Sequence, residues 1–487
     1  MRTASPALQT SPALQTSPTS SRIQRVRGTV AALAVLATLA SVTAGASPTA
    51  LGGTAVGHFE GTLPSGAAYT IDAPEHWNGT VLLFSHGYRP AGSPNPAQNA
   101  PDDAARKLLL KEGYALVGSS YATTGWAVEQ AVPDQLGALD AFTARVGAAR
   151  RTLAWGQSYG GLVTTALAER HADRVDGSLS MCGLVHGGVA NWNSTLDPVF
   201  ALRTLLAPHS GIRLTRFSDP SQATANARKM SAVLTGAQST PTGRARIALA
   251  AALHAVPGWN DPKQPRPAPG DHAARQANQY AALTGLVQAP AFSWRQEAEA
   301  RAGGSMSWNT GVDYAAILAR SSQYEEVKAL YKAAGHSLEA DLNALASAPR
   351  LQADRRAVSY MKRNVAFTGR LTKPQLDIHT TGDALVPVRA ESAYRSAVTR
   401  AGRGGLLRQA YVGNAGHCTF SPAEELAAVH VTERRITTGR WGDTSPAALN
   451  AEARRADPTT AARYGPFRPG PYPRPYDLAP PPRTRQR

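Results

Sequence analysis

The sequence contains few cysteines and, beyond its N-terminal region, no long apolar run. Two cysteines among 487 residues exclude a disulfide-rich scaffold, and in an exported protein so low and even a count favours a single structural disulfide. No segment after residue 46 has about 18 unbroken apolar residues, the length that a transmembrane helix requires. We therefore expect no stable membrane insertion of the mature protein.

Acidic residues are the minority among the charged ones. The chain has 34 Asp and Glu against 51 Lys and Arg, which gives a net charge of +17. Four of these charges lie in residues 1–46 and five in the tail from Ala451, which leaves +8 on the body, where acids and bases are interspersed. A modestly basic surface suits anionic polymers or cell envelopes as well as simple solubility. Because no nucleic-acid-binding or metal-binding motif accompanies it, we expect neither a nucleic-acid partner nor a metal ion.

Residues 1–46 have the three parts of a secretory signal peptide. Three arginines between residues 22 and 27 precede an apolar stretch at 30–42, which is followed by Ala44-Gly45-Ala46. A basic region, a short apolar core and a small-x-small site are typical of such a signal. The alternative, a membrane anchor, is less favoured because the stretch is short and rich in alanine. The alanine and arginine content indicates a GC-rich bacterial genome, so the sequence predicts a secreted bacterial protein.

Predicted strands and helices alternate on either side of a long helical region. Six strands are expected before residue 186 and two after residue 370, namely 56–60, 67–72, 80–85, 114–119, 151–155, 175–181, 374–379 and 406–412. Helices are expected between them, at about 102–112, 133–146 and 161–170. This alternation predicts an α/β fold with a mostly parallel sheet that helices cover on both faces.

The region 187–350 is helical, poor in strands, and broken by prolines at 261–269. Inserted after the sixth strand, it would lie over the carboxyl ends of the strands as a cap. We expect most of its aromatic residues to form the cap's own core, although some could line a pocket. The predicted domains are an α/β core in two parts, 47–186 and 351–450, the cap at 187–350, and an extended Pro/Arg-rich tail at 451–487.

The segment Gly156-Gln157-Ser158-Tyr159-Gly160 matches the pattern G-x-S-x-G. A short apolar run precedes it and helical spacing follows it, so Ser158 would lie on a sharp turn between a strand and a helix. A serine on so tight a turn needs neighbours without a β-carbon. The alternative is a chance match in a chain with 43 glycines, which the flanking strand and helix disfavour. Ser158 is therefore the candidate nucleophile.

A serine hydroxyl needs a histidine to accept its proton and an acid to orient that histidine. Asp383 follows a predicted strand directly and precedes a helix, where the orienting acid is expected, whereas Asp377 lies inside the strand. His417 follows the last predicted strand in a glycine-rich loop. His379 ends a strand too early for the chain order serine, acid, histidine. The predicted triad is therefore Ser158, Asp383 and His417.

The oxyanion of a tetrahedral intermediate needs two hydrogen-bond donors, and loss of one costs about a hundredfold or more in rate. The backbone amide of Tyr159, next after the nucleophile, is the first candidate donor. The second is expected in the loop after the strand 80–85, where we choose the amide of Tyr88. His86 in the same loop is expected to support the loop rather than to act as an acid or base.

These four features together resemble the α/β-hydrolase superfamily: the His86-Gly87-Tyr88 loop, the serine elbow, the acid and the last histidine. The resemblance covers residues 56–186 and 370–437. It implies the α/β-hydrolase fold with about eight strands, no cofactor, and acyl transfer through an acyl-serine.

The pair His417-Cys418 is also similar to tannases and feruloyl esterases, in which the partner of that cysteine precedes the nucleophile. Gln157 occupies that place here, and the second cysteine is Cys182. To reach the serine, the His417 loop must cross above the strand that ends near Cys182, and adjacent strands lie about 4.8 Å apart. Bridged cysteines need α-carbons within about 4.4–6.8 Å. We predict a Cys182–Cys418 bond that positions His417, the alternative being two buried thiols.

The leading functional hypothesis is a secreted, monomeric serine hydrolase of carboxylic esters. Its substrate would be a small molecule or a polymer, such as a plant phenolic ester, a lipid or a polyester. One rival is a peptidase or aminopeptidase of the same fold, with a substrate amine held by Glu297, Glu299, Glu325 and Glu326, whose helical spacing favours a solvated face instead. Another is a catalytically inactive cell-envelope binding protein, which would need no triad.

Overall fold

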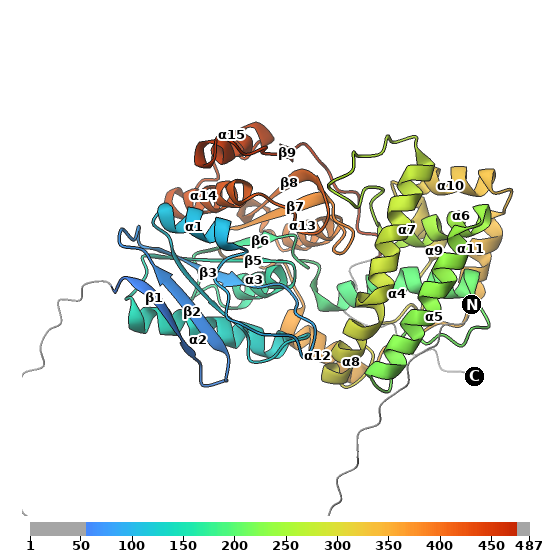
Figure 1. The fold of residues 1–487 in the computed structure, drawn as a ribbon, viewed down its shortest axis with the longest axis horizontal. Helices are drawn as coiled ribbons and strands as arrows, with labels where there is room; N and C mark the ends of the chain where they lie inside the picture. The colour runs from blue at the N-terminus through green and yellow to red at the C-terminus, as the bar shows by residue number, and fades with distance from the viewer. Residues whose placement is uncertain (1–54, 475–487) are drawn as a thin grey trace, which may run out of the picture. The chain divides into compact units, whose positions relative to one another are not determined.

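The computed structural model describes residues 55–474 and has one mixed sheet at its centre (Figure 1). The order of its nine strands is β1-β2-β4-β3-β5-β6-β7-β8-β9. The strands are β1 (Gly57–Thr62), β2 (Ala68–Ala73), β3 (Thr80–Ser85), β4 (Ala115–Ser119), β5 (Arg151–Gln157), β6 (Gly177–Met181), β7 (Gln375–Gly382), β8 (Leu407–Ala415) and β9 (Tyr464–Gly465). The predicted signal peptide at 1–46 lies outside the described residues.

The strands from β4 to β8 run parallel, whereas the pairs β1–β2, β2–β4 and β8–β9 are antiparallel. All six residues of β3 are buried, as in a sheet covered on both faces. Its Val81 and Leu83 join the apolar core on one face, and Leu82 and Phe84 join the core on the other. The predicted α/β fold with a mostly parallel sheet is confirmed. The ninth strand, β9, lies in the tail and was not predicted, because a strand of two residues shows no alternation of apolar and polar residues.

Helices α2 and α3 pack on one face of the sheet, and α14 packs on the other with α1 and α15 against it (Figure 1). The helices outside the cap are α1 (Asp103–Lys111), α2 (Val128–Arg145), α3 (Tyr159–Arg170), α13 (Ala390–Arg400), α14 (Pro422–Thr438) and α15 (Pro446–Ala456), with a 3₁₀ turn, η2 (Gly404–Leu406). Local sequence sets their ends: α14 begins with a Ser421–Glu424 capping box and ends at Gly439, at φ 70°. Among residues 55–474, no helix is both long and apolar enough to cross a membrane.

The cap is inserted between β6 and β7, as predicted, and has its own apolar core. Its helices are α4 (Gly187–Leu206), α5 (Pro220–Gln238), α6 (Pro241–His254), α7 (His272–Gln288), α8 (Arg295–Ala302), α9 (Tyr314–Ala319), α10 (Tyr324–Ala333), α11 (Leu338–Ser347) and α12 (Arg355–Val365), with a π-helical turn, η1 (Pro290–Trp294). Tyr314 and Tyr331 lie in the cap core. Trp192 instead joins the apolar core on one face of the sheet, so not every aromatic residue of the cap belongs to the cap core.

The tail contacts the edge of the sheet and then the cap. After β9 has paired with β8, the hydroxyl of Tyr472 donates to the carbonyl of Ala190 in α4 at 3.1 Å. Arg474 is buried, donates to the carbonyl of Trp308, and lies 3.6 Å from Asp197. The end of the described chain is therefore held to the cap by an ion pair and hydrogen bonds.

The turn between β5 and α3 packs tightly against β3. A β-carbon on Gly160 would lie 1.8 Å from the carbonyl oxygen of Ser85, and one on Gly156 would lie 2.6 Å from it. Neither position can hold a side chain without displacing backbone. The two glycines of the sequence motif thus let the first turn of α3 approach the sheet, which determines where Ser158 projects.

Candidate active site

Ser158 occupies the turn between β5 and α3, with φ 57° and ψ −122°. A positive φ is costly for a residue with a β-carbon and persists only where the surroundings enforce it. The Ser158 amide donates to the carbonyl of Met181 at 2.9 Å, and its own carbonyl accepts from Gly161 at 2.9 Å. These bonds hold the serine at the carboxyl edge of the sheet. The amide of Tyr159, one predicted oxyanion donor, is the first N–H of α3.

Ser158 lines a small cavity of ≈ 40 Å³, whose walls are mostly apolar and include five aromatic side chains. The sheet loops and α3 contribute Tyr88, Trp126 and Tyr159, and the cap contributes Trp192 and Trp294. The ring centroids of Tyr88 and Trp294 are 4.4 Å apart, and those of Trp126 and Trp192 are 5.0 Å apart. The remaining lining residues are Leu184, Asn191, Thr195, Leu286, Pro290, Leu385 and Val386. Such walls suit a planar, apolar group.

Asp383 and His417 form a short pair beyond the ends of β7 and β8. Nδ1 of His417 lies 2.6 Å from Oδ2 of Asp383. The amides of Leu385 and Val386 donate to Oδ1 of the aspartate at 2.9 Å each. The Asp383 side chain is fully buried, whereas 21% of the His417 side chain is exposed. A carboxylate on Nδ1 favours the tautomer whose Nε2 can accept a proton, as a general base requires.

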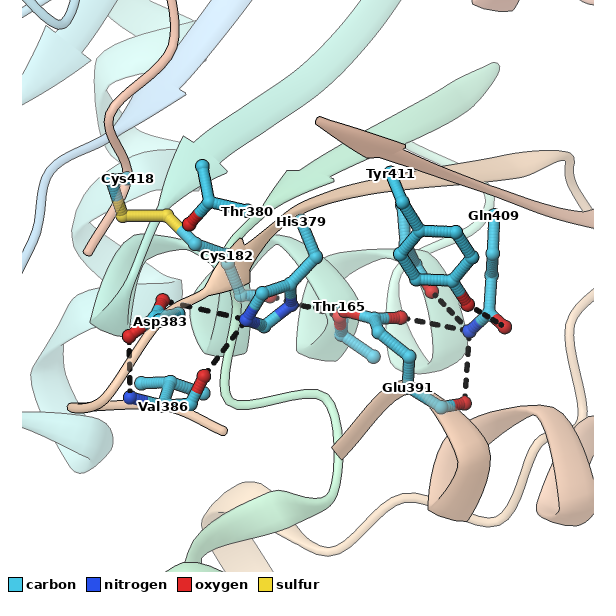
Figure 2. A network of polar contacts seen from close by, with 12 residues as sticks. Thr165, Cys182, His379, Thr380, Asp383, Val386, Glu391, Gln409, Tyr411 and Cys418 are labelled. Carbon is cyan, nitrogen blue, oxygen red and sulfur yellow. Dashed lines mark hydrogen bonds and ion pairs between the residues drawn. A yellow bond between two sulfur atoms is a disulfide. The ribbon is translucent and has the colours of Figure 1, made fainter. Parts of the chain in front are cut away.

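A second histidine contacts the same carboxylate oxygen (Figure 2). Nε2 of His379 lies 3.4 Å from Oδ2 of Asp383 and 2.8 Å from the carbonyl of Val386, and Nδ1 lies 2.8 Å from Oε1 of Glu391. Burial would lower the pKa of His379, but hydrogen bonds to Asp383 and Glu391 outweigh it and raise the pKa to about 10. Burial would raise the pKa of Asp383, but the charge of His417 and the His379 hydrogen bond lower it to about 2. The buried carboxylate is therefore ionised and faces two imidazoles.

Asp377, the alternative acid, points to other partners. Its side chain accepts hydrogen bonds from Gln375 at 2.8 Å and from Gln409 at 3.2 Å. Burial, and then the negative charge of Glu391, raise the pKa of Asp377 well above its usual range. The structure thus pairs His417 with Asp383. It gives His379, for which the sequence suggested no part in the site, a contact with that same aspartate.

The His86-Gly87-Tyr88 loop lies against the serine, because a β-carbon on Gly87 would be 3.7 Å from Cβ of Ser158. The two ring nitrogens of His86 lie 2.7 Å from the Gly87 carbonyl and 2.9 Å from the Ser120 carbonyl. Burial lowers the pKa of His86 to about 4, so this imidazole is uncharged at neutral pH. In a trans peptide the C=O and N–H point in opposite directions. An uncharged imidazole has one N–H and donates to only one of the two carbonyls. In the tautomer that donates to Gly87, it orients the Tyr88 amide, the other predicted oxyanion donor.

The expected disulfide is present: Cys182, just after β6, is bonded to Cys418, and their α-carbons are 5.5 Å apart. The bond ties the loop of His417 to the sheet, and Sγ of Cys418 lies 3.4 Å from Nε2 of His417. Within residues 55–474, no hydrogen bond joins His417 to Ser158. The structure thus brings Asp383 and His417 into contact. Ser158 lies in the cavity with aromatic walls and makes no hydrogen bond to His417 within the described residues.

The four cap carboxylates considered for an amine site are already engaged. Glu297 contacts Arg301, Glu299 accepts from the amide of Arg216, Glu325 pairs with Lys328, and Glu326 pairs with Arg275. The expectation of a solvated face is wrong for Glu299 and Glu326, which are buried. Hydrogen bonds from neighbouring segments of the cap compensate each carboxylate for the loss of water on burial.

The chain is 32% identical over 430 residues to the o-phthalyl amidase of Xanthobacter agilis, an alignment that covers 83% of this chain and 92% of the amidase. The chain belongs to the family of this amidase. The superfamily expected from the motifs is confirmed, and the protein is a hydrolase. No family model matches the chain.

Two solved structures are also similar to this chain. Feruloyl esterase B from Aspergillus oryzae is 14% identical, with 78% of this chain and 80% of that chain covered and a TM-score of 0.38. The 2-hydroxy-6-oxo-6-phenylhexa-2,4-dienoate hydrolase of a Rhodococcus strain is 14% identical, with 78% and 99% covered and a TM-score of 0.34.

The charge on His379 predicts how stability depends on pH. A histidine whose pKa is raised from 6.5 to about 10 stabilises the fold fully below pH 6.5, and this contribution is lost as the pH rises through about 10. We expect the free energy of unfolding of the His379→Gln variant to be lower than that of the wild type at pH 6, with a gap that narrows towards pH 10. Urea denaturation across this range measures the gap. The exposed His209, changed to Gln, is the control, and a gap that does not vary with pH contradicts the prediction.

Proposed function

We propose that this chain is a serine hydrolase that removes aromatic acyl groups from amides or esters through an acyl-serine intermediate. The observation that carries the proposal is the position of Ser158. This serine stands on an enforced positive-φ turn at the wall of an aromatic cavity, at the sheet edge that also carries the Asp383–His417 pair.

In the proposed reaction, Oγ of Ser158 attacks the acyl carbon and its proton passes to Nε2 of His417. Asp383 holds the imidazolium that forms, and the amides of Tyr88 and Tyr159 donate to the oxyanion. His417 then protonates the leaving nitrogen or oxygen, and water hydrolyses the acyl-serine by the same steps. The first proton transfer requires a Ser158–His417 hydrogen bond, so the serine side chain or the imidazole has to turn to form it during binding.

Two observations support an aromatic acyl group. The cavity at Ser158 has five aromatic side chains, and the related amidase is named for an o-phthalyl group, which is an aromatic acyl group. The relationship to an amidase extends the ester preference expected from the sequence to amides, since an acyl-serine forms from either. The aminopeptidase alternative gains no support, because the cap carboxylates that would bind a free amine are paired within the protein.

We also propose that the enzyme acts outside the cell as a monomer. The signal-like sequence at 1–46 supports export. The Cys182–Cys418 disulfide supports it too, because such bonds persist in oxidising compartments. Expression in a secreting bacterium should deliver active protein to the medium without residues 1–46, and retention of the full-length chain in the cytoplasm would contradict export.

Ser158→Ala should lower kcat/KM for aryl amides and esters by at least about a thousandfold, because the attacking oxygen is removed. A fluorophosphonate probe should label the wild type and not this variant. Ser239→Ala, which changes an exposed serine of the cap, is the matched control and should keep both activity and labelling. Turnover by folded Ser158→Ala protein at the wild-type rate would refute the mechanism, and an unlabelled wild type would favour an inactive binding protein.

Replacing an aromatic wall of the cavity should change acyl selectivity. Trp294→Ala removes a ring that contacts Tyr88 at the cavity wall, with ring centroids 4.4 Å apart. We expect kcat/KM for 4-nitrophenyl benzoate to fall by about tenfold or more, while the value for 4-nitrophenyl acetate changes by about twofold at most, because only the aromatic acyl group uses that surface. Equal losses for the two esters would show that the cavity does not receive the acyl group.

A further inference from the structure

A second cavity lies where the cap, the segments flanking Asp383 and the tail meet. It has a volume of ≈ 300 Å³ and shares no lining residue with the cavity at Ser158. Its walls come from the loop after α6, from α7, from the turn before α10, from the loop between β7 and α13, and from the tail after β9. Each of these segments contributes only a few residues, so the cavity exists only in the folded chain.

Four arginines line this cavity and no acidic residue does: Arg266, Arg275, Arg389 and Arg468. Arg275 pairs with Glu326 at 2.7 Å. The other three have no carboxylate partner within the described residues. Arg266 and Arg468 are exposed at the rim, whereas Arg389 is only 6% exposed. The cavity therefore has a surplus of positive charge, part of which is removed from bulk water.

Arg389 differs from the other buried arginines of the described chain. Arg295 lies 3.9 Å from Glu299, and Arg474 lies 3.6 Å from Asp197. Arg389 instead donates one hydrogen bond, to Oγ of Ser322 at 2.6 Å. Burial lowers its pKa, yet a guanidinium stays protonated at neutral pH. A buried charge without a counter-charge costs several kcal/mol in general, and an anion in the cavity would supply that counter-charge.

The cavity also has apolar walls. Trp259, Phe467 and Pro469 line it beside the arginines. A small inorganic anion would satisfy the guanidinium groups but leave these surfaces in contact with water. An organic anion with an apolar body would use both kinds of wall, since arginine binds carboxylates in a fixed fork and aromatic rings bind flat apolar groups.

We propose that this cavity is a binding site for an organic polycarboxylate, with its carboxylates on Arg389 and Arg468 and its apolar body against Trp259 and Phe467. The site is separate from the acyl cavity and does not depend on the reaction proposed for Ser158. Its lining includes Thr381 and Gly382 at the end of β7, which immediately precede Asp383.

Calorimetric titration of Ser158→Ala protein with benzene-1,3,5-tricarboxylate tests the proposal without catalysis. We expect saturable binding that weakens as salt is raised, and no binding of the uncharged trimethyl ester. Arg389→Gln should weaken the tricarboxylate at least tenfold. Arg468→Gln, at the exposed rim, should weaken tricarboxylate binding about two- to fivefold. This variant keeps the test valid if the Arg389→Gln protein fails to fold.

Arg400→Gln is the matched control, because it removes the same charge from the exposed end of α13, whose N-cap residue is Arg389. It should leave the affinity within twofold of that of the parent protein. Wild-type protein whose Ser158 has been blocked by an arylsulfonyl fluoride should bind the tricarboxylate equally well. No binding at all, equal loss in the Arg400 and Arg468 variants, or loss after the serine is blocked would each overturn the proposal.

Discussion

The site depends on keeping a carboxylate ionised where water does not reach it. Asp383 has no exposed surface, and in such surroundings a carboxyl group without partners takes up a proton and loses its ability to hold an imidazolium. Two backbone amides bind one of its oxygens, and His417 and His379 approach the other. His379 is in turn bonded to Glu391. The negative charge of Asp383 is thus stabilised by a row of groups of alternating charge: Asp383, His379 and Glu391 (Figure 2).

The parallel sheet explains how residues far apart in sequence come to surround this carboxylate. In parallel strands the carboxyl ends share one edge of the sheet. β5 therefore brings Ser158, β7 brings Asp383 and β8 brings His417 to the same edge. The strand between β5 and β7 is β6, which ends at Met181, directly before Cys182. The disulfide from that cysteine to Cys418 fixes the loop of His417 across this edge of the sheet. Without the disulfide, only a few hydrogen bonds would hold the loop there.

What could be predicted from the sequence was local. The G-x-S-x-G pattern, the position of Asp383 just past a strand and the glycine-rich loop of His417 each occupy a few consecutive residues. Because the chain has only two cysteines, only one intramolecular disulfide was possible. The contact between His379 and Asp383 could not be predicted so directly: the two lie four residues apart, but the chain turns sharply after β7, and Glu391 on α13 supplies the second partner. The sequence offered both Asp383 and Asp377 as the acid that orients the histidine, and the structure pairs His417 with Asp383.

The sequence indicated that some aromatic residues of the cap could line a pocket, but it did not indicate which residues form the two cavities. The aromatic cavity combines Tyr88 and Trp126 from the sheet loops with Trp192 and Trp294 from the cap, and no spacing rule relates them. The arginine cavity is assembled in the same way. Both cavities lie between the cap and the rest of the chain, so their shapes depend on how the cap is held. The buried pair of Arg474 and Asp197 binds the tail to α4, the helix that also carries Trp192. Because breaking a buried pair leaves an uncompensated charge, this contact opposes movement of α4 and favours a cavity that is formed before the substrate binds.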